Sequence, residues 1–216
     1  MIDAIQPVAA LFVRKNSVYK TLPGVDCYDQ VRDATTWRGG CPIVAHPPCR
    51  TWSSMSTFCT LSPEDWAREQ EYARWSVDMI RLYGGVLEHP YRSSLWPDKK
   101  LPAVGERDAY GGFTLAIDQF HWGHLCQKRT KLYIAGIEPD NVPPIPHRDG
   151  EPTHRISSLA GRKMSAEARH AKNYKPAISR CRRDVTPPDF AVWLVQLARR
   201  CSPPGHKHNK TEGSML

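Results

Sequence analysis

A cysteine held in a rigid turn is the residue of this chain best suited to chemistry. An apolar run over residues 42–45 leads into Pro47 and Pro48, which are followed directly by Cys49. Each proline fixes the backbone and removes an N–H donor, so Cys49 is placed just beyond a strand end, where a thiol can act as a nucleophile. The alternative is that Cys49 is a small buried apolar residue, as most cysteines are.

Polar residues also stand next to two further strand candidates, after one of them and before the other. Residues 84–87 are apolar and run into Glu88, and a Gln-Lys-Arg-Thr run, residues 127–130, precedes the strand-like residues 131–136. Short apolar runs separated by a helical stretch are typical of a parallel α/β sheet. Because the carboxyl ends of such strands face one crevice, we expect an α/β fold with a mostly parallel sheet that gathers these polar groups.

Helix signals support this architecture. Ser62 before Pro63, with two acids in the first turn, predicts a helix that runs to Leu82 and ends at Gly84. Thr186, with an acid three residues on, predicts the cap of a second helix. Residues 8–13 and 25–29 are the earlier strand candidates.

The three motifs, in this order, resemble those of the cytosine-C5 DNA methyltransferase family over roughly residues 40 to 137. In the first motif Arg50 replaces a glutamine, in the second His89 replaces an asparagine, and in the third Lys131 replaces an arginine. The matching positions are Pro47, Pro48, Cys49, Trp52 and Ser53, then Glu88 and Pro90, then Gln127 and Arg129. The resemblance implies a Rossmann-like, methyltransferase-type sheet.

The resemblance also implies roles for these residues. Cys49 would add to C6 of a cytosine as a thiolate, which makes C5 a nucleophile. Glu88 would protonate or hydrogen-bond N3, and Arg129 or Lys131 would stabilise charge near O2. The substrate would be bound by Pro47, Pro48, Trp52, Ser53, His89, Pro90 and Gln127.

S-adenosylmethionine is the cofactor that the resemblance implies, with Asp29 and Asp33 as its candidate ligands. Family members place a glycine-rich turn after the first strand, but no glycine precedes Gly24 here. Only 48 residues precede Cys49, a tight fit for three strands when a βαβ unit takes about 30 residues. The chain therefore uses an altered cofactor pocket, uses another electrophile, or has lost catalysis while keeping the base pocket.

Composition is consistent with a nucleic-acid partner. The 30 Lys and Arg residues against 22 Asp and Glu residues give a net charge of +8, which attracts a polyanion. Basic residues gather in the second half, at Arg162, Lys163, Arg169, His170, Lys172, Lys175, Arg180, Arg182 and Arg183. Residues 137–185 are irregular and proline-rich, so they leave little room for a target-recognition domain. DNA or a pyrimidine nucleotide is the expected partner, with a separate specificity subunit as one way to read sequence.

Other features bound the class of protein. No apolar stretch approaches the ~18 to 20 residues of a membrane span, and the first residues do not resemble a secretory leader. Seven cysteines without regular spacing suit a reducing cytoplasm. We expect one α/β domain over residues 1–200 and a disordered tail over 201–216. Such a compact chain would suit a bacteriophage or mobile element.

Two alternatives from other classes remain. The first is a zinc-dependent nucleobase deaminase or hydrolase, built from His46, Cys49, His89, His121, His124 and Cys126. The deaminase signature requires His-x-Glu, which the chain lacks, so we expect no metal. The second is a non-catalytic DNA-binding homologue that keeps the base pocket.

Overall fold

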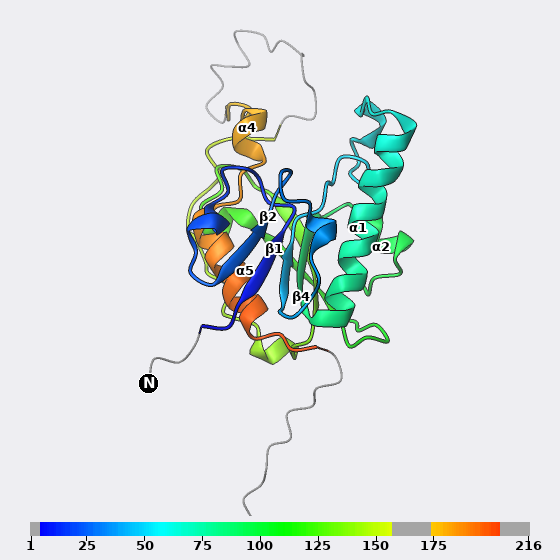
Figure 1. Ribbon diagram of the computed structural model, residues 1–216. Helices are drawn as coiled ribbons and strands as arrows, with labels where there is room; N and C mark the ends of the chain where they lie inside the picture. Colours follow the sequence, from blue (N-terminus) through cyan, green and yellow to red (C-terminus); the bar gives the residue numbers. More distant parts are fainter. Residues whose placement is uncertain (1–4, 157–173, 204–216) are drawn as a thin grey trace, which may run out of the picture.

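The computed structural model describes residues 5–156 and 174–203, which form an α/β structure around one six-stranded sheet (Figure 1). The strands lie in the order β2-β1-β3-β4-β6-β5. Their bounds are Val8–Leu11 for β1, Val25–Tyr28 for β2, Ile43–Ala45 for β3, Gly85–Pro90 for β4, Phe113–Asp118 for β5 and Arg129–Ala135 for β6. The first four strands are parallel, and β6 is antiparallel to both β4 and β5. The predicted α/β fold with a mostly parallel sheet is confirmed.

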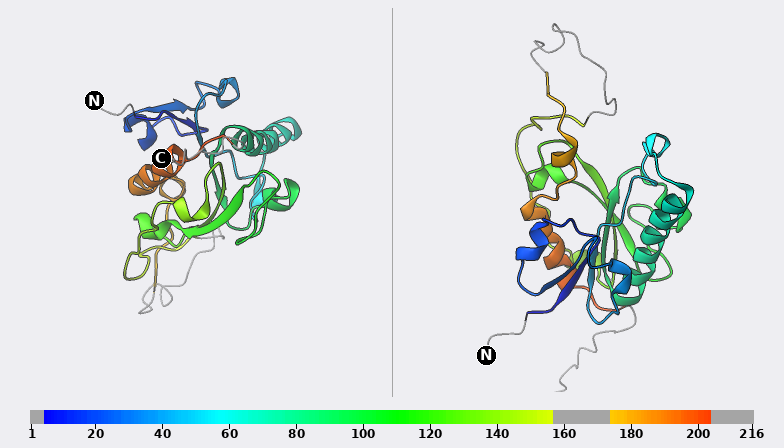
Figure 2. Two further views of the ribbon diagram at one scale, coloured as in Figure 1. Left: turned by 90° about the horizontal axis from the view of Figure 1, so that it is seen from below. Right: turned by 45° about the horizontal axis from the view of Figure 1, so that its top comes forward.

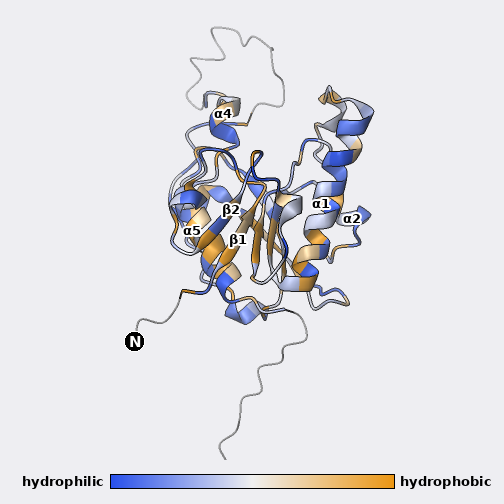
Figure 3. Cartoon of the chain, in the orientation of Figure 1, coloured by the Kyte–Doolittle hydropathy of each residue, from blue (hydrophilic) through white to orange (hydrophobic). Residues whose placement is uncertain are grey.

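Both faces of the sheet are covered, which agrees with the wholly apolar sequences of β1 and β3. Helix α5, Pro188–Arg199, packs on one face, and the long helix α1, Pro63–Tyr83, packs on the other. Figure 2 shows these two helices on opposite sides of the strands. Figure 3 shows the strands as the apolar centre of the molecule. Val44, Val86 and Leu132 belong to the core under α5, whereas Ala45, Leu87 and Tyr133 belong to the core under α1.

Helix α1 begins and ends as predicted. The Ser62 hydroxyl accepts a hydrogen bond from the backbone N–H of Asp65, and Pro63 occupies the first turn. Gly84 ends the helix at a φ of 77°. The next residue must also be glycine, because a Cβ on Gly85 would lie 2.1 Å from the Ile43 carbonyl oxygen of the neighbouring strand.

Helix α5 differs from the prediction at its start. The N-cap is Pro187 and no side chain caps the helix, so the expected cap by Thr186 is wrong. Proline at N1 and Asp189 in the first turn are enough to start it. Two short helices, α2 at Leu95–Asp98 and α4 at Arg180–Arg183, are the other α-helices within residues 5–156 and 174–203.

Three strands do fit before Cys49, because the connections between them are short. The segments contain only 3₁₀ turns, at Val18–Thr21 after β1 and at Ala34–Thr36 after β2. The sequence analysis missed strand β5 and the antiparallel direction of β6. None of the helices described is long and apolar enough to cross a membrane. The basic residues Arg162, Lys163, Arg169, His170 and Lys172, and the tail from residue 204, lie outside the described residues.

Candidate functional site

The candidate site lies where the strand order reverses. The chain passes from β1 to β2 on one side and from β3 to β4 on the other, so the connections from the carboxyl ends of the adjacent strands β1 and β3 leave in opposite directions. Such a point opens a crevice in α/β sheets. His46 follows β3 and donates its backbone N–H to the Leu11 carbonyl at the end of β1, 3.1 Å away. Cys49 comes three residues later, and Glu88 lies in the neighbouring strand β4.

The turn that carries Cys49 is fixed by hydrogen bonds on both sides. The Cys49 carbonyl accepts the backbone N–H groups of Trp52 at 3.1 Å and Ser53 at 2.9 Å. The next residue, Arg50, places its Nε 2.8 Å from both carboxylate oxygens of Glu69 on α1, and Glu69 is only 8% exposed. Arg50 therefore joins the turn to the helix through an ion pair, which a neutral glutamine could not form.

Cys49 is exposed but is not activated in the free protein. Crowding by protein atoms, together with the negative charge of Glu88, raises the pKa of Cys49 to about 11. The Lys128 ammonium acts in the opposite direction and is too weak to reverse the shift. At neutral pH the side chain is a thiol, so any thiolate must form together with substrate binding.

Glu88 is held as an acceptor of hydrogen bonds. Its Oε2 lies 3.1 Å from His46 Nδ1, and its Oε1 lies 3.0 Å from Gln119 Nε2. Burial by itself would raise the pKa of Glu88, but the hydrogen bond from His46 and the charge of Lys128 outweigh it and lower the pKa to about 2. Glu88 is thus a carboxylate, and His46 Nδ1 carries the hydrogen between the two.

A tyrosine extends this chain of hydrogen bonds. Tyr19 is fully buried, and its Oη lies 2.9 Å from His46 Nε2. Burial raises the pKa of Tyr19 well above its ordinary value, so its hydroxyl keeps the proton and donates it to Nε2. From Tyr19 through His46 to Glu88, each donor points toward the carboxylate.

Gln119 approaches Glu88 from the other side. It follows β5, is 1% exposed, and donates from Nε2 to Glu88 and to Thr130 Oγ1, both at 3.0 Å. The reverse orientation of the amide would bring two acceptors together.

Three features of this cluster were not predicted from the sequence: Tyr19, His46 as a hydrogen-bond donor, and Gln119. Only His46 had a signal in the sequence, because it stands in the motif itself.

The predicted cations do not join this cluster. In the antiparallel pair β4 and β6, Glu88 is opposite Leu132, and Lys131 is opposite His89. Residues opposite each other share a face, and successive residues alternate, so Arg129 and Lys131 project to the α1 side, away from Glu88. Arg129 lies over the Tyr91 ring at 4.6 Å, and Lys131 lies 5.2 Å from the Trp96 ring.

Lys128 is the cation that the structure brings to Glu88. It stands next to Arg129 in the sequence, so strand alternation places it on the opposite face of the sheet. Its charge acts on both Glu88 and Cys49. The expectation that Arg129 or Lys131 stabilises charge near O2 of a bound base stays a prediction, and the structure adds Lys128 as a cation that acts on Glu88 and Cys49.

The other residues expected to bind substrate differ in burial and do not form one cluster. His89 is buried on the α1 side, with Nδ1 2.7 Å from Ser93 Oγ, and burial lowers its pKa to about 4. Its ring lies against the carbonyls of Pro47 and Pro48, so it supports the turn from below. Trp52 is 3% exposed. Ser53 Oγ accepts the Met55 N–H at 3.2 Å, Gln127 is exposed, and Pro90 pairs with Thr130 in the sheet.

Both aspartates expected at the cofactor make hydrogen bonds within the protein. The Asp29 carboxylate accepts the N–H groups of Val31 and Arg32 and pairs with Lys20, whose hydrogen bond is the main reason that its pKa is lowered to about 2. Asp33 caps the 3₁₀ turn through the Thr35 N–H, 2.9 Å away. Both carboxylates therefore help to fix the segment that follows β2, and their binding of S-adenosylmethionine stays a prediction.

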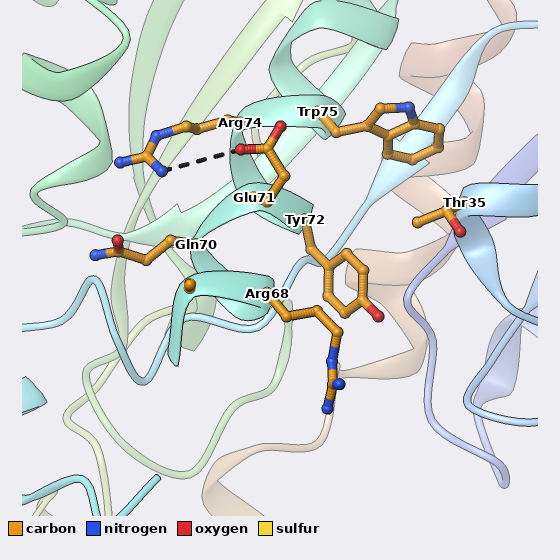
Figure 4. A pocket seen from close by; sticks show the side chains of 8 residues that line it. Thr35, Arg68, Gln70, Glu71, Tyr72, Arg74 and Trp75 are labelled. Carbon is orange, nitrogen blue, oxygen red and sulfur yellow. Dashed lines mark ion pairs between the residues drawn. The ribbon is translucent and has the colours of Figure 1, made fainter. Parts of the chain in front are cut away.

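The first turn after β1 has an unusual backbone. Phe12 takes a φ of 59°, a conformation that glycine adopts freely and a phenylalanine rarely. Its ring centroid lies 5.2 Å from Tyr72 and 6.1 Å from Trp75, both on α1. These two aromatic rings line a groove of about 510 Å³ together with Thr35 and Arg68 (Figure 4). An aromatic ligand could stack here, beside the turn that the family fills with glycine.

Basic residues surround the carboxyl end of the sheet. Arg14 follows β1 and donates from Nη1 to the Cys181 carbonyl of α4 at 3.3 Å, which brings Arg182 and Arg183 to this end. Lys15 and Arg182 are exposed. Figure 1 shows α4 beyond the ends of the strands. Cations at this edge can contact a phosphate backbone.

The histidines and cysteines considered for zinc do not cluster. Within residues 5–156 and 174–203, no group of three or more His, Cys, Asp or Glu side chains is placed to hold a metal ion. His46 and His89 lie on opposite faces of the sheet, and His124 Nδ1 is bound to the Cys126 backbone, 3.0 Å from its carbonyl oxygen.

Comparison of the sequence with protein-family models gave no match, and comparison with curated proteins gave no significant match. What the protein does must then be inferred from the residues at the end of the sheet.

Proposed function

We propose that this protein is a pyrimidine-modifying transferase, similar to the cytosine-C5 DNA methyltransferases, that attacks C6 of the base through Cys49. The observation that carries the proposal is the pairing of Cys49 with Glu88. The two side chains come from different motifs, yet they lie at the carboxyl ends of adjacent strands, close enough for the charge of Glu88 to act on the thiol.

The reaction needs a nucleophile, a proton for the ring and an electrophile. The Cys49 sulfur forms a bond to C6 and releases its proton, and the C5–C6 electron pair moves toward C5. A proton on N3, passed on by Glu88, keeps the ring from accumulating charge, and Lys128 stabilises what remains. C5 then bonds to the transferred group, while the bond between that group and its donor breaks and leaves its electron pair on the donor. The hydrogen on C5 leaves as a proton to water, and the electron pair that it leaves behind re-forms the C5–C6 double bond and expels the Cys49 thiolate.

The donor is the least constrained part of the proposal. S-adenosylmethionine, when bound, would supply a methyl group as the electrophile, and within residues 5–156 the turn after β1 contains no glycine. The groove beside Tyr72 and Trp75 is the surface best suited to a donor that carries an aromatic ring.

DNA is the proposed substrate, and single-stranded DNA or a nucleotide is the alternative. The basic end formed by Arg14, Lys15 and α4 suits phosphate contacts that position a strand without reading it. A partner subunit would then choose the sequence. All seven cysteines are free thiols, which agrees with the proposed cytoplasmic setting.

A covalent-capture experiment tests the proposal. DNA containing 5-fluorocytosine is incubated with the protein and S-adenosylmethionine, and the adduct is measured by denaturing electrophoresis and mass spectrometry. We expect an adduct with wild type and with Cys181→Ala, an exposed-cysteine control, and none with Cys49→Ala. Nucleosides from cells expressing the protein should then carry a new mass on deoxycytidine, and wild type without adduct or new mass would refute the transferase.

A non-catalytic base-binding protein is the second candidate. The neutral thiol of Cys49 and the phenylalanine at the glycine turn favour it. It predicts that Cys49→Ala binds DNA as tightly as wild type and that no donor gives turnover.

A further inference from the structure

The hydrogen bonds around Glu88 favour its carboxylate form. His46 donates to Oε2 at 3.1 Å, and Gln119 donates to Oε1 at 3.0 Å. A hydrogen bond to a carboxylate is stronger than the same bond to a neutral carboxyl group, so both donors favour the ionised state. In the free protein Glu88 can only accept, although 15% of its side chain is open to solvent and to a ligand.

Pyrimidines differ in what they present to such a group. Uracil and thymine carry a hydrogen on N3, which the carboxylate can accept. Neutral cytosine carries a lone pair on N3, which faces the carboxylate with an unfavourable contact between two acceptors. Cytosine fits only when one extra proton lies between N3 and Glu88.

We propose that His46 is a positioning residue that holds Glu88 as an acceptor, so that binding of cytosine takes up one proton whereas binding of uracil takes up none. The proposal rests on the proposed function for the identity of the base. It goes further because it assigns His46, which stands beside the catalytic turn, a role in selecting the base.

The other charged groups around Glu88 all lower its pKa. Lys128, which precedes β6, and His46 stabilise the carboxylate, and His89 of β4 adds to them. Tyr19 faces His46 Nε2, and its hydroxyl lies 2.9 Å from that nitrogen. Cys49 is a thiol and brings no charge. Among the described residues, then, His46 is the titratable group in direct contact with the carboxylate.

Binding as a function of pH tests the inference. The probes are fluorescent oligodeoxyadenylates that hold one cytosine, one uracil or one abasic site, and affinity is measured by anisotropy between pH 5.5 and 8.5 at constant ionic strength. The abasic probe gives the phosphate contribution. We expect the cytosine-specific affinity to weaken by up to tenfold per pH unit, and the uracil-specific affinity to stay constant.

Variants assign this dependence to His46. His46→Leu and the smaller His46→Ala remove the donor, so Glu88 is protonated more easily and the cytosine dependence flattens at the low-pH end. His46→Gln keeps a donor and should keep the wild-type slope, as should the exposed-histidine control His147→Leu. Glu88→Gln should abolish the slope.

Each result has a distinct meaning. A flat cytosine profile in wild type, equal slopes for cytosine and uracil, or no base-specific affinity overturns the inference. A wild-type slope in both His46→Leu and His46→Ala removes the role of His46. A covalent adduct together with a cytosine affinity that does not change with pH would support the transferase and overturn the inference. A pH-dependent cytosine affinity without an adduct would support the inference and contradict the transferase.

Discussion

His46 and Glu88 are 42 residues apart in the sequence, yet His46 Nδ1 lies 3.1 Å from Glu88 Oε2. The contact exists because β3 and β4 are adjacent and parallel, and both residues project to the α5 face at the carboxyl ends of these strands. It helps to keep Glu88 ionised in the free protein, and burial together with the charge of Glu88 raises the pKa of Cys49 to about 11.

The first prediction concerns stability and pH. Because the pKa of Glu88 is lowered from 4.5 to about 2, its contribution is present above pH 4.5 and is lost as the pH falls toward 2. Glu88→Gln should lower the free energy of unfolding by roughly 2–3 kcal/mol at pH 6, and the difference from wild type should shrink by pH 3. Urea denaturation at both values checks this, with exposed Glu64→Gln as the control.

The second prediction concerns thiol reactivity. Cys49 and Cys181 are both exposed, but the pKa of Cys181 is lowered, mainly by a hydrogen bond with Ser179. Iodoacetamide at pH 7.5 should therefore modify Cys181 first, as measured by peptide mass spectrometry. Glu88→Gln removes the charge that raises the pKa of Cys49 and should speed its alkylation several-fold. Faster modification of Cys49 than Cys181 in wild type would contradict the assignment.

The third prediction separates Lys128 from Lys131. If Lys128 stabilises charge on the ring, Lys128→Ala should slow adduct formation with 5-fluorocytosine DNA by about tenfold or more. Lys131→Ala, on the other face of the sheet, should have a smaller effect, and exposed Lys100→Ala should have none. An equal loss of the rate of adduct formation in Lys128→Ala and Lys131→Ala would show that the face of the sheet does not decide which cation acts.

The fourth prediction concerns the brace behind Cys49. Arg50→Ala leaves the carboxylate of Glu69 buried without its partner and should cost about 1–2 kcal/mol. Glu69→Gln should cost less, because an amide is cheaper to bury than a lone carboxylate. Thermal unfolding measures both variants, and the same ranking is expected for their rates of adduct formation. A less stable Glu69→Gln would point to a different role for the pair.

The fifth prediction concerns the backbone at Phe12. Phe12→Gly relieves the positive φ but loses the contacts with Tyr72 and Trp75, whereas Phe12→Ala loses the contacts and keeps the strain. We expect the glycine variant to be about 1 kcal/mol more stable than the alanine variant, and both to be less stable than wild type. Chemical denaturation midpoints give the comparison, which fails if alanine is as stable as glycine.

Much of the fold follows from local patterns. The cap at Ser62, the proline at position 63 and the glycine at position 84 bound helix α1 correctly, because caps act within one turn. The apolar run before Pro47 is a buried strand for the same local reason. Strand β5 was not predicted, and the cap predicted at Thr186 was wrong, since β5 is stabilised by pairing with β6 and α5 begins without a side-chain cap.

The positions of Cys49 after one strand and of Glu88 in another could be predicted from residue order, because strand ends and prolines are local signals. Which side chains meet these two residues depends on how the strands pair. One position along a strand exchanges one face of the sheet for the other, so Lys128 reaches Glu88 and Lys131 does not. Tyr19 and Gln119 reach the same point from distant segments, through pairings of strands that no local pattern specifies.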